Sequence, residues 1–303
     1  MNPQPAGSAR GAILLMISIT LVWGLSWPAN KVALAEITPW VYRTLNLNIG
    51  GLGLLALAWA SGASLRIPRR ELRPLLLASF FNFTVWHIGS AYGIALLPAG
   101  RAVIIAFTMP AWAALFDFFL MGERLTWRRC LGLTLGLGGL AVLMGPDIKK
   151  LDAAPWGALA MLAAAGGWGM GTVLMKKYSW TMPTLTLTGW QLILGGLPIT
   201  AGSFLMEPWT GLAGASWPAW AATAFIIAMS MIYAYWAWFT VLGRISAALA
   251  AISTMVIPVV GVFTSALWLG EKLGLQELLA LGMVLSSMGV VFLDSGRLGR
   301  RRP

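Results

Sequence analysis

The chain alternates long apolar segments with short polar joints along its whole length. Stretches of roughly 17 or more apolar residues recur through the 303 residues, and such stretches are long enough to cross a bilayer as helices. We predict ten spans, at about 11–31, 40–61, 74–97, 101–121, 128–145, 155–176, 184–205, 216–242, 245–269 and 275–293. The joints leave no room for a soluble domain.

Two of the joints carry the same short motif. Gly122-Glu123-Arg124 and Gly270-Glu271-Lys272 are 148 positions apart, and so are Pro110 and Pro258 inside the preceding spans. A weaker echo at an offset of 145 pairs Trp23-Gly24 and Lys31 with Trp168-Gly169 and Lys176. These offsets indicate two copies of one unit.

Each copy holds five spans, an odd number, so the second copy must cross the membrane in the opposite sense. We therefore predict an all-α integral membrane protein with ten transmembrane helices, built as two inverted five-helix repeats around a central cavity. The first repeat would be residues 1–147 and the second residues 148–303. Inverted repeats are a transporter architecture.

Composition supports the membrane assignment. Hydrophobic residues make up 58% of the chain and charged residues 10%, against about 25% charged in soluble domains. The net charge of +11 lies in the joints, where Lys and Arg set orientation, so we expect no nucleic-acid partner. With a cytoplasmic N-terminus, 15 of the 21 basic residues fall on cytoplasmic joints. We predict a multi-pass protein of the cytoplasmic (inner) membrane, with an uncleaved first helix and both termini in the cytoplasm.

Several segments resemble a known family. WGLSWPANKVAL followed by TPWVYR is similar to the first two helices of EamA-type members of the drug/metabolite transporter (DMT) superfamily. ALLPAGRAVIIAFTMPAWAALFDFFLMGERLTWRRCLGLTLGLGGLAVL resembles their fourth and fifth, and residues 245–293 repeat that block. The resemblance implies two inverted five-helix repeats and export of small metabolites. The aromatic richness and ten-helix length most resemble the YddG-type exporters of aromatic and other amino acids.

The two mid-span prolines are candidates for a hinge or a cavity wall. Pro110 and Pro258 lack an amide hydrogen, so each interrupts the helical hydrogen bonds of its span. Matched interruptions in two halves point to the central site of a transporter. The alternative is a pair of packing kinks that neighbouring helices compensate.

Aromatic residues deep inside spans are candidates for the substrate cavity. Tryptophans near span ends, such as Trp156, fit an interfacial belt, but interior ones do not. In MIYAYWAWF, Tyr233 and Trp236 share one helical face, while Tyr235 and Trp238 lie on another. One face would pack on helices and the other would line the cavity. We assign to the cavity Trp23, Trp86, Trp168, Tyr233 and Trp236, with ordinary bundle packing as the alternative.

Polar residues inside spans add to this list. Asn82 and His87 lie on span three, and His87 is the chain's single histidine. An ionisable group inside a membrane is a functional hypothesis by default, although a neutral histidine also bridges helices. Lys31 and Arg43 flank the external end of the first hairpin, where they would form a gate, contact a cargo carboxylate or extend to the interface. Asp117 is a candidate proton site or a structural ion pair.

Amino-acid export by alternating access, with aromatic and other amino acids as cargo, is the function we expect. The runner-up is proton-coupled export of drugs or other metabolites, and the alternative from another class is a membrane-embedded lipid-modifying enzyme. No metal-binding or nucleophile motif occurs, so we expect no catalytic residue, no metal and no cofactor. The expected partners are amino acids and the lipid bilayer. The oligomeric state stays open, with a monomer as the simplest expectation.

Overall fold

The structure is a computed structural model that describes residues 6–123, 126–144, 154–242 and 247–298. The predicted boundary between the repeats, at 147/148, lies outside these residues. Within the described ranges, every regular element is a helix. Six segments are long and apolar enough to cross a membrane, namely Gly11–Leu34, Ala99–Met121, Pro155–Lys177, Thr184–Met206, Trp217–Trp238 and Leu275–Phe292. The chain is an all-helical membrane protein, and the count of ten spans stays a prediction.

The helices follow the same order in the two halves of the chain. The first half holds α1 (Ala6–Leu34), α2 (Pro39–Ala60), α3 (Arg69–Ser79), the π-helix η1 (Phe80–Val85), α4 (Trp86–Leu96), α5 (Ala99–Ala106), α6 (Met109–Met121) and α7 (Trp127–Met144). The second half holds α8 (Ala154–Lys177), α9 (Thr184–Met206), the 3₁₀-helix η2 (Trp209–Gly214), α10 (Trp217–Phe225), the π-helix η3 (Ile226–Tyr233), α11 (Ala234–Leu242), α12 (Ala247–Leu269) and α13 (Leu275–Leu298).

Two backbone features repeat at the offset found in the sequence. The π-helical segments η1 and η3 interrupt the third helical rod of each half, and their last residues, Val85 and Tyr233, are 148 positions apart. Gly122 and Gly270 both adopt the left-handed conformation, with φ of 65° and 67°, directly after α6 and α12. A left-handed residue at a helix C-terminus favours glycine, because a Cβ atom is strained there.

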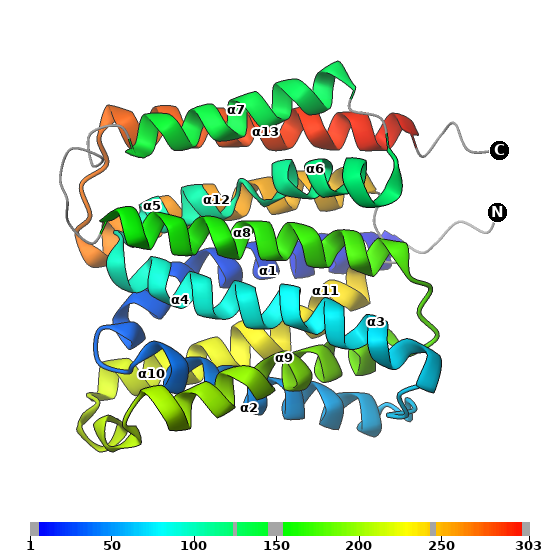
Figure 1. Ribbon diagram of the computed structural model, residues 1–303, viewed down its shortest axis with the longest axis vertical. Helices are drawn as coiled ribbons and strands as arrows, with labels where there is room; N and C mark the ends of the chain where they lie inside the picture. The colour runs from blue at the N-terminus through cyan, green and yellow to red at the C-terminus, as the bar shows by residue number, and fades with distance from the viewer. Residues whose placement is uncertain (1–5, 124–125, 145–153, 243–246, 299–303) are drawn as a thin grey trace.

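Equivalent helices of the two halves pack against each other. α2 lies along α9 at one edge of the bundle, and α7 lies along α13 at the opposite edge (Figure 1). Gly51 permits the α2–α9 contact, since a Cβ there would lie 2.8 Å from Ile193 Cδ1. On the other edge, Ser287 Oγ donates a hydrogen bond to Gly132 O at 2.6 Å. A two-fold axis that relates the two halves would bring equivalent helices together in this way, as α2 with α9 and α7 with α13.

The bundle has two ends, which we name from the course of the chain. α1 begins and α13 finishes at the same end, here called the terminal end (Figure 1). The opposite end, where α1 gives way to α2, is the distal end. The candidate site residues lie at the distal end, along the bundle interior, and at the terminal end.

Candidate functional site

Lys31 ties α1 to the end of α4 at the distal end. Its ammonium donates hydrogen bonds to the carbonyl oxygens of Ile94, Ala95 and Leu97, at 2.7, 2.9 and 2.8 Å. The last carbonyls of a helix have no partner within the helix and carry its negative dipole end, so a cation there is stabilising. Lys31 therefore caps the C-terminus of α4.

Glu271, from the repeated joint, caps the helix that follows. Its carboxylate accepts hydrogen bonds from the amides of Ala99 and Gly100 at 2.6 and 2.9 Å, at the start of α5. An acidic side chain at a helix N-terminus satisfies amides that the helix leaves free. The turn between α4 and α5 is thus held from one side by Lys31 of the first half and from the other by Glu271 of the second. We call this arrangement the distal clamp.

Further polar contacts join the halves at the distal end. Glu207 accepts hydrogen bonds from the amides of Trp40 and Val41 at 2.9 and 3.2 Å, and Arg101 pairs with Glu277 at 2.8 Å. Glu36 accepts two bonds of 2.6 Å from the hydroxyl and amide of Ser216. These bonds lower the pKa of Glu36, so its carboxylate stays charged at the start of α10.

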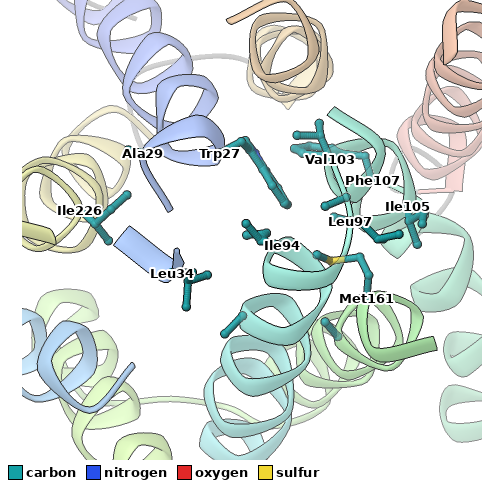
Figure 2. Close-up of a cluster of buried hydrophobic side chains, with 14 of the residues drawn as sticks. Trp27, Ala29, Leu34, Ile94, Leu97, Val103, Ile105, Phe107, Met161 and Ile226 are labelled. Carbon is teal, nitrogen blue, oxygen red and sulfur yellow. The ribbon is translucent and has the colours of Figure 1, made fainter. Parts of the chain in front are cut away.

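Apolar side chains fill the space behind the distal clamp. Figure 2 shows Trp27 pointing from α1 toward Ile94 and Leu97, with Val103 and Phe107 of the α5 segment beside it. Trp27 and Phe107 have ring centroids 6.4 Å apart, and these five side chains are at most 7% exposed. We call these five side chains the apolar plug, which lies behind the distal clamp.

The two prolines occupy equivalent sequence positions in different local structures. Pro110 lies in the first turn of α6, after a break at Phe107 and Thr108 that separates α5 from α6. Pro258 lies inside the unbroken helix α12. The first turn of a helix tolerates proline because its amide has no helical partner, whereas an interior proline removes one hydrogen bond. No contact of the structure tests the hinge role, which stays a prediction.

The interior aromatic residues form several separate groups in the described part of the chain. Trp23 contacts Tyr235 and Trp238 at centroid distances of 5.9 and 5.8 Å, and Tyr235 lies 6.3 Å from Phe83. We call Trp23, Phe83, Tyr235 and Trp238 the aromatic row; it joins α1, η1 and α11. Trp86 and Trp168 pair separately at 5.2 Å, between α4 and α8.

The two faces of the eighth predicted span have different neighbours. Tyr235 and Trp238 face Trp23, whereas Tyr233 and Trp236, the residues assigned to the cavity from sequence, pair with each other at 6.0 Å. The Tyr233 hydroxyl shares a hydrogen bond of 2.7 Å with Ser18 Oγ on α1. Both faces therefore contact α1, and the assignment of Tyr233 and Trp236 to the cavity stays a prediction.

Asn82 lies at a helix contact. Its amide nitrogen donates to Gln191 Oε1 on α9 at 3.3 Å, and the side chain fills the space that a Cβ at Gly171 of α8 would need. His87 is 2% exposed and stacks on Phe83 at 5.8 Å, with neither ring nitrogen hydrogen-bonded in the described part of the chain. His87 thereby adjoins the aromatic row.

Arg43 is the most deeply buried cation among the predicted site residues. It is 3% exposed, and its guanidinium donates to Asn30 Oδ1, His87 O and Ser90 Oγ at 2.9, 3.1 and 3.2 Å. The site residues predicted from the sequence do not include Asn30 or Ser90. Asn30 lies one residue before Lys31 in the segment PANK, a polar residue inside a span, and that was the available signal.

Asp117 belongs to the terminal end. Its Oδ2 pairs with Lys176 Nζ at 3.0 Å, which links α6 of the first half to α8 of the second. Lys176 is the counterpart of Lys31 at the offset of 145, yet it has a carboxylate partner where Lys31 has carbonyls. Glu71 accepts hydrogen bonds from the amide and hydroxyl of Thr181 at the same end. The equivalent lysines therefore make different contacts at the two ends: Lys31 caps a helix at the distal end, and Lys176 forms an ion pair at the terminal end.

Apolar spans, duplicated halves and polar links between the halves at both ends define a multi-pass membrane transporter. The profile of the EamA-like transporter family matches twice, over residues 10–145 and 155–293, and the chain belongs to this family. The family consists of transporters and not enzymes, so the lipid-modifying alternative is wrong. Among the described residues, no group of three or more His, Cys, Asp or Glu is placed to hold a metal ion.

Similar proteins give the same class. The chain is 30% identical over 285 residues to the uncharacterized transporter YvbV of Bacillus subtilis, covering 92% of this chain and 90% of that one. It is 26% identical over 289 residues to a probable amino-acid metabolite efflux pump of Escherichia coli, covering 91% and 92%. A solved crystal structure, 22% identical, superposes with a TM-score of 0.65 over 95% of this chain and 99% of its own, which supports the fold alone.

Proposed function

We propose that this transporter exports amino acids, aromatic ones among them, by alternating access in the cytoplasmic membrane. The observation that carries the proposal is the aromatic row, because side chains from both halves meet there in the bundle interior. Rings of this size bind apolar side chains through buried area and favour offset or tilted stacking with other rings. The Escherichia coli relative named as an amino-acid metabolite efflux pump supports the same cargo class.

The proposal includes ten crossings, with both termini in the cytoplasm. α1 begins and α13 finishes at the terminal end, as an even number of crossings requires (Figure 1). Arg69, Arg70, Arg73, Lys176 and Lys177 lie at that end, and Lys31, Arg101 and Lys272 lie at the other, a bias that favours a cytoplasmic terminal end. A single chain contains both halves, so a monomer suffices for this mechanism.

The distal clamp and apolar plug give a direction to the cycle. With the distal end closed, cargo enters from the terminal end and reaches the aromatic row. Release on the far side requires Lys31 and Glu271 to leave the turn between α4 and α5 and the plug to separate. Pro110 and Pro258 lie next to these segments and serve as hinge or cavity wall, while Trp86, Trp168 and Trp236 line the path of the cargo.

Proton-coupled export of drugs or other metabolites is the second candidate. Asp117 is the carboxylate that would carry the proton, and one of its oxygens, Oδ1, has no hydrogen-bond partner in the described structure. The other oxygen forms the ion pair with Lys176, which favours a structural role. Proton coupling therefore depends on whether this pair opens during the cycle.

Efflux from intact cells tests the proposal. Cells that overproduce the protein and are fed a phenylalanine dipeptide should release phenylalanine into the medium several-fold faster than cells carrying an empty vector. A protonophore added at the same time should leave a facilitated carrier active and should stop a proton-coupled one. Equal release from both cell lines, for every amino acid fed, would contradict amino-acid export.

A further inference from the structure

Arg43 is a buried charge that the described residues do not neutralise. Its three hydrogen-bond acceptors are an amide oxygen, a carbonyl oxygen and a hydroxyl, all uncharged. No carboxylate of the described residues lies within 4.0 Å of it, and the ring of Tyr42, 5.1 Å away, is its other favourable contact. Burying an unpaired cation in a low-dielectric interior is costly, so such groups normally pair with an anion.

Several polar atoms beside Arg43 also have no partner. Both ring nitrogens of His87 and both side-chain amide atoms of Asn46 are buried without a hydrogen bond in the described structure. His87 contacts Arg43 directly through its carbonyl oxygen, and Asn46 lies three residues after Arg43 on the same helix. Most buried polar groups in proteins are hydrogen-bonded, so unpartnered ones clustered around a cation indicate a missing ligand.

The cluster adjoins the aromatic row. The His87 ring stacks on Phe83 with an interplanar angle of 13°, and Phe83 leads to Tyr235 and Trp23. One end of this arrangement is therefore cationic and rich in hydrogen-bond donors, and the other is apolar and aromatic. A molecule with a carboxylate at one end and an apolar or aromatic group at the other fits both.

We propose that Arg43, with His87 beside it, is the subsite for the carboxylate of the cargo. The inference rests on the proposed function and narrows it to amino acids with a free α-carboxylate. Arginine has five N–H groups, of which three donate in the present structure, so two stay available for a carboxylate. Lys31 is excluded from this role in the closed state, because three carbonyls occupy its ammonium.

Competition by a cargo without a carboxylate tests the subsite. Purified protein in proteoliposomes is assayed for counterflow of labelled phenylalanine, with unlabelled phenylalanine or phenylalaninamide as competitor. Because charge-assisted hydrogen bonds are the strong ones, the amide should compete about 10- to 100-fold more weakly than the acid. In Arg43→Gln, phenylalanine should compete as weakly as phenylalaninamide does, and competition by phenylalaninamide should not change. His87→Gln should reduce the difference in competition between phenylalanine and phenylalaninamide, and this variant provides the readout if Arg43→Gln does not fold.

The matched control is Arg69→Gln, which removes an exposed arginine at the start of α3 and should keep the parental preference for the acid. If both Arg43→Gln and His87→Gln weaken acid and amide in equal proportion, the cluster is scaffold and the subsite is wrong. If the parent protein carries neither phenylalanine nor any other amino acid, the proposed function itself fails, and the subsite with it. If the parent protein transports amino acids but phenylalanine and phenylalaninamide compete equally, the carboxylate subsite is wrong and the proposed function stands.

Discussion

Single residues explain why acidic side chains are placed in the joints of so apolar a chain. Glu207 and Glu271 each cap the N-terminus of a helix in the first half, and Glu36 reaches the start of α10 in the second. The sequence locates Glu271 through the repeated motif, which does not include Glu36 or Glu207. It does not identify the partners of these glutamates, since the amide of Ala99 lies 172 positions from Glu271 and is brought near only by the packing of α5 on α12.

Trp23 gives the most specific prediction at this scale. Trp23→Ala removes a ring that contacts Tyr235 and Trp238 in the aromatic row. Burying a large apolar side chain contributes about 1.5–3 kcal/mol, so loss of much of that contact should weaken phenylalanine binding roughly ten-fold or more. Binding of alanine as cargo should be weakened less, because its small side chain has less surface in contact with the ring. Competition of each amino acid in the counterflow assay measures both effects.

Trp156→Ala is the matched control, because Trp156 is 70% exposed at the start of α8. It should alter yield or thermal stability and leave the order of cargo preference intact. Should Trp23→Ala reduce transport of phenylalanine and alanine by the same factor, the aromatic row is scaffold and does not contact cargo.

At the scale of helices, the two halves have the same general order, but α5 and α6 are separated by a break where the second half has the continuous helix α12. The π-helical segments η1 and η3 recur at matching positions, and such segments are frequent at functional sites. Sequence reasoning missed them, because a π-helix leaves no strong local pattern in the residues. It found both prolines but not their difference, since the break at Phe107 and Thr108 depends on packing around α5.

The prolines should therefore differ in effect. Pro258→Ala adds an amide that can donate to the Thr254 carbonyl inside α12, which stiffens a continuous helix, whereas Pro110→Ala adds one in the first turn of α6. Both variants should insert and purify normally, and Pro258→Ala should slow counterflow several-fold more than Pro110→Ala. Parental rates for both variants would show that the prolines are packing features.

Lys31 provides a prediction for the distal clamp. Lys31→Met keeps most of the length of the side chain but removes three charged hydrogen bonds to the end of α4. A hydrogen bond to a charged group contributes about 1.5–3 kcal/mol, so loss of even one of the three should raise the population of the open state about ten-fold or more. A cysteine introduced by Val103→Cys in a Cys130→Ala background, buried in the apolar plug, should then react about ten-fold faster with an impermeant thiol reagent from outside.

The control for the clamp is Lys272→Met, which removes an exposed lysine in the joint beside Glu271. It should leave the labelling rate of Val103→Cys at the parental value. Unchanged labelling in Lys31→Met as well would mean that these contacts do not hold the distal end closed.

For the whole molecule, the repeat read from the sequence accounts for most of the architecture. In the structure, the first helix of each half packs on a helix of the other half. α1 of the first half lies on α12 of the second, and α8, the counterpart of α1, lies on α6 of the first. Apolar length and repeated motifs predict the rods and their order, because both are local properties. The sequence does not show which contacts hold each end of the bundle. Lys31 and its counterpart Lys176 are the same residue type, and they differ only in their partners, which are carbonyl oxygens for Lys31 and the carboxylate of Asp117 for Lys176.

The topology that we propose predicts opposite locations for two exposed lysines. In a Cys130→Ala background, Lys272→Cys at the distal end should react with an impermeant thiol reagent added to intact cells, and Lys177→Cys at the terminal end should not. After permeabilisation both should react. Labelling of Lys177→Cys in intact cells would place the terminal end outside and reverse the proposed direction of transport.

The most direct measurement of the central claim is counterflow by the purified chain in proteoliposomes without nucleotide or ion gradient. Liposomes loaded with unlabelled phenylalanine should transiently accumulate labelled phenylalanine above equilibrium, and external leucine should compete. A facilitated amino-acid carrier that works by alternating access requires this result. Uptake equal to that of protein-free liposomes for every amino acid tested, by protein that elutes as a single folded species, would contradict the account.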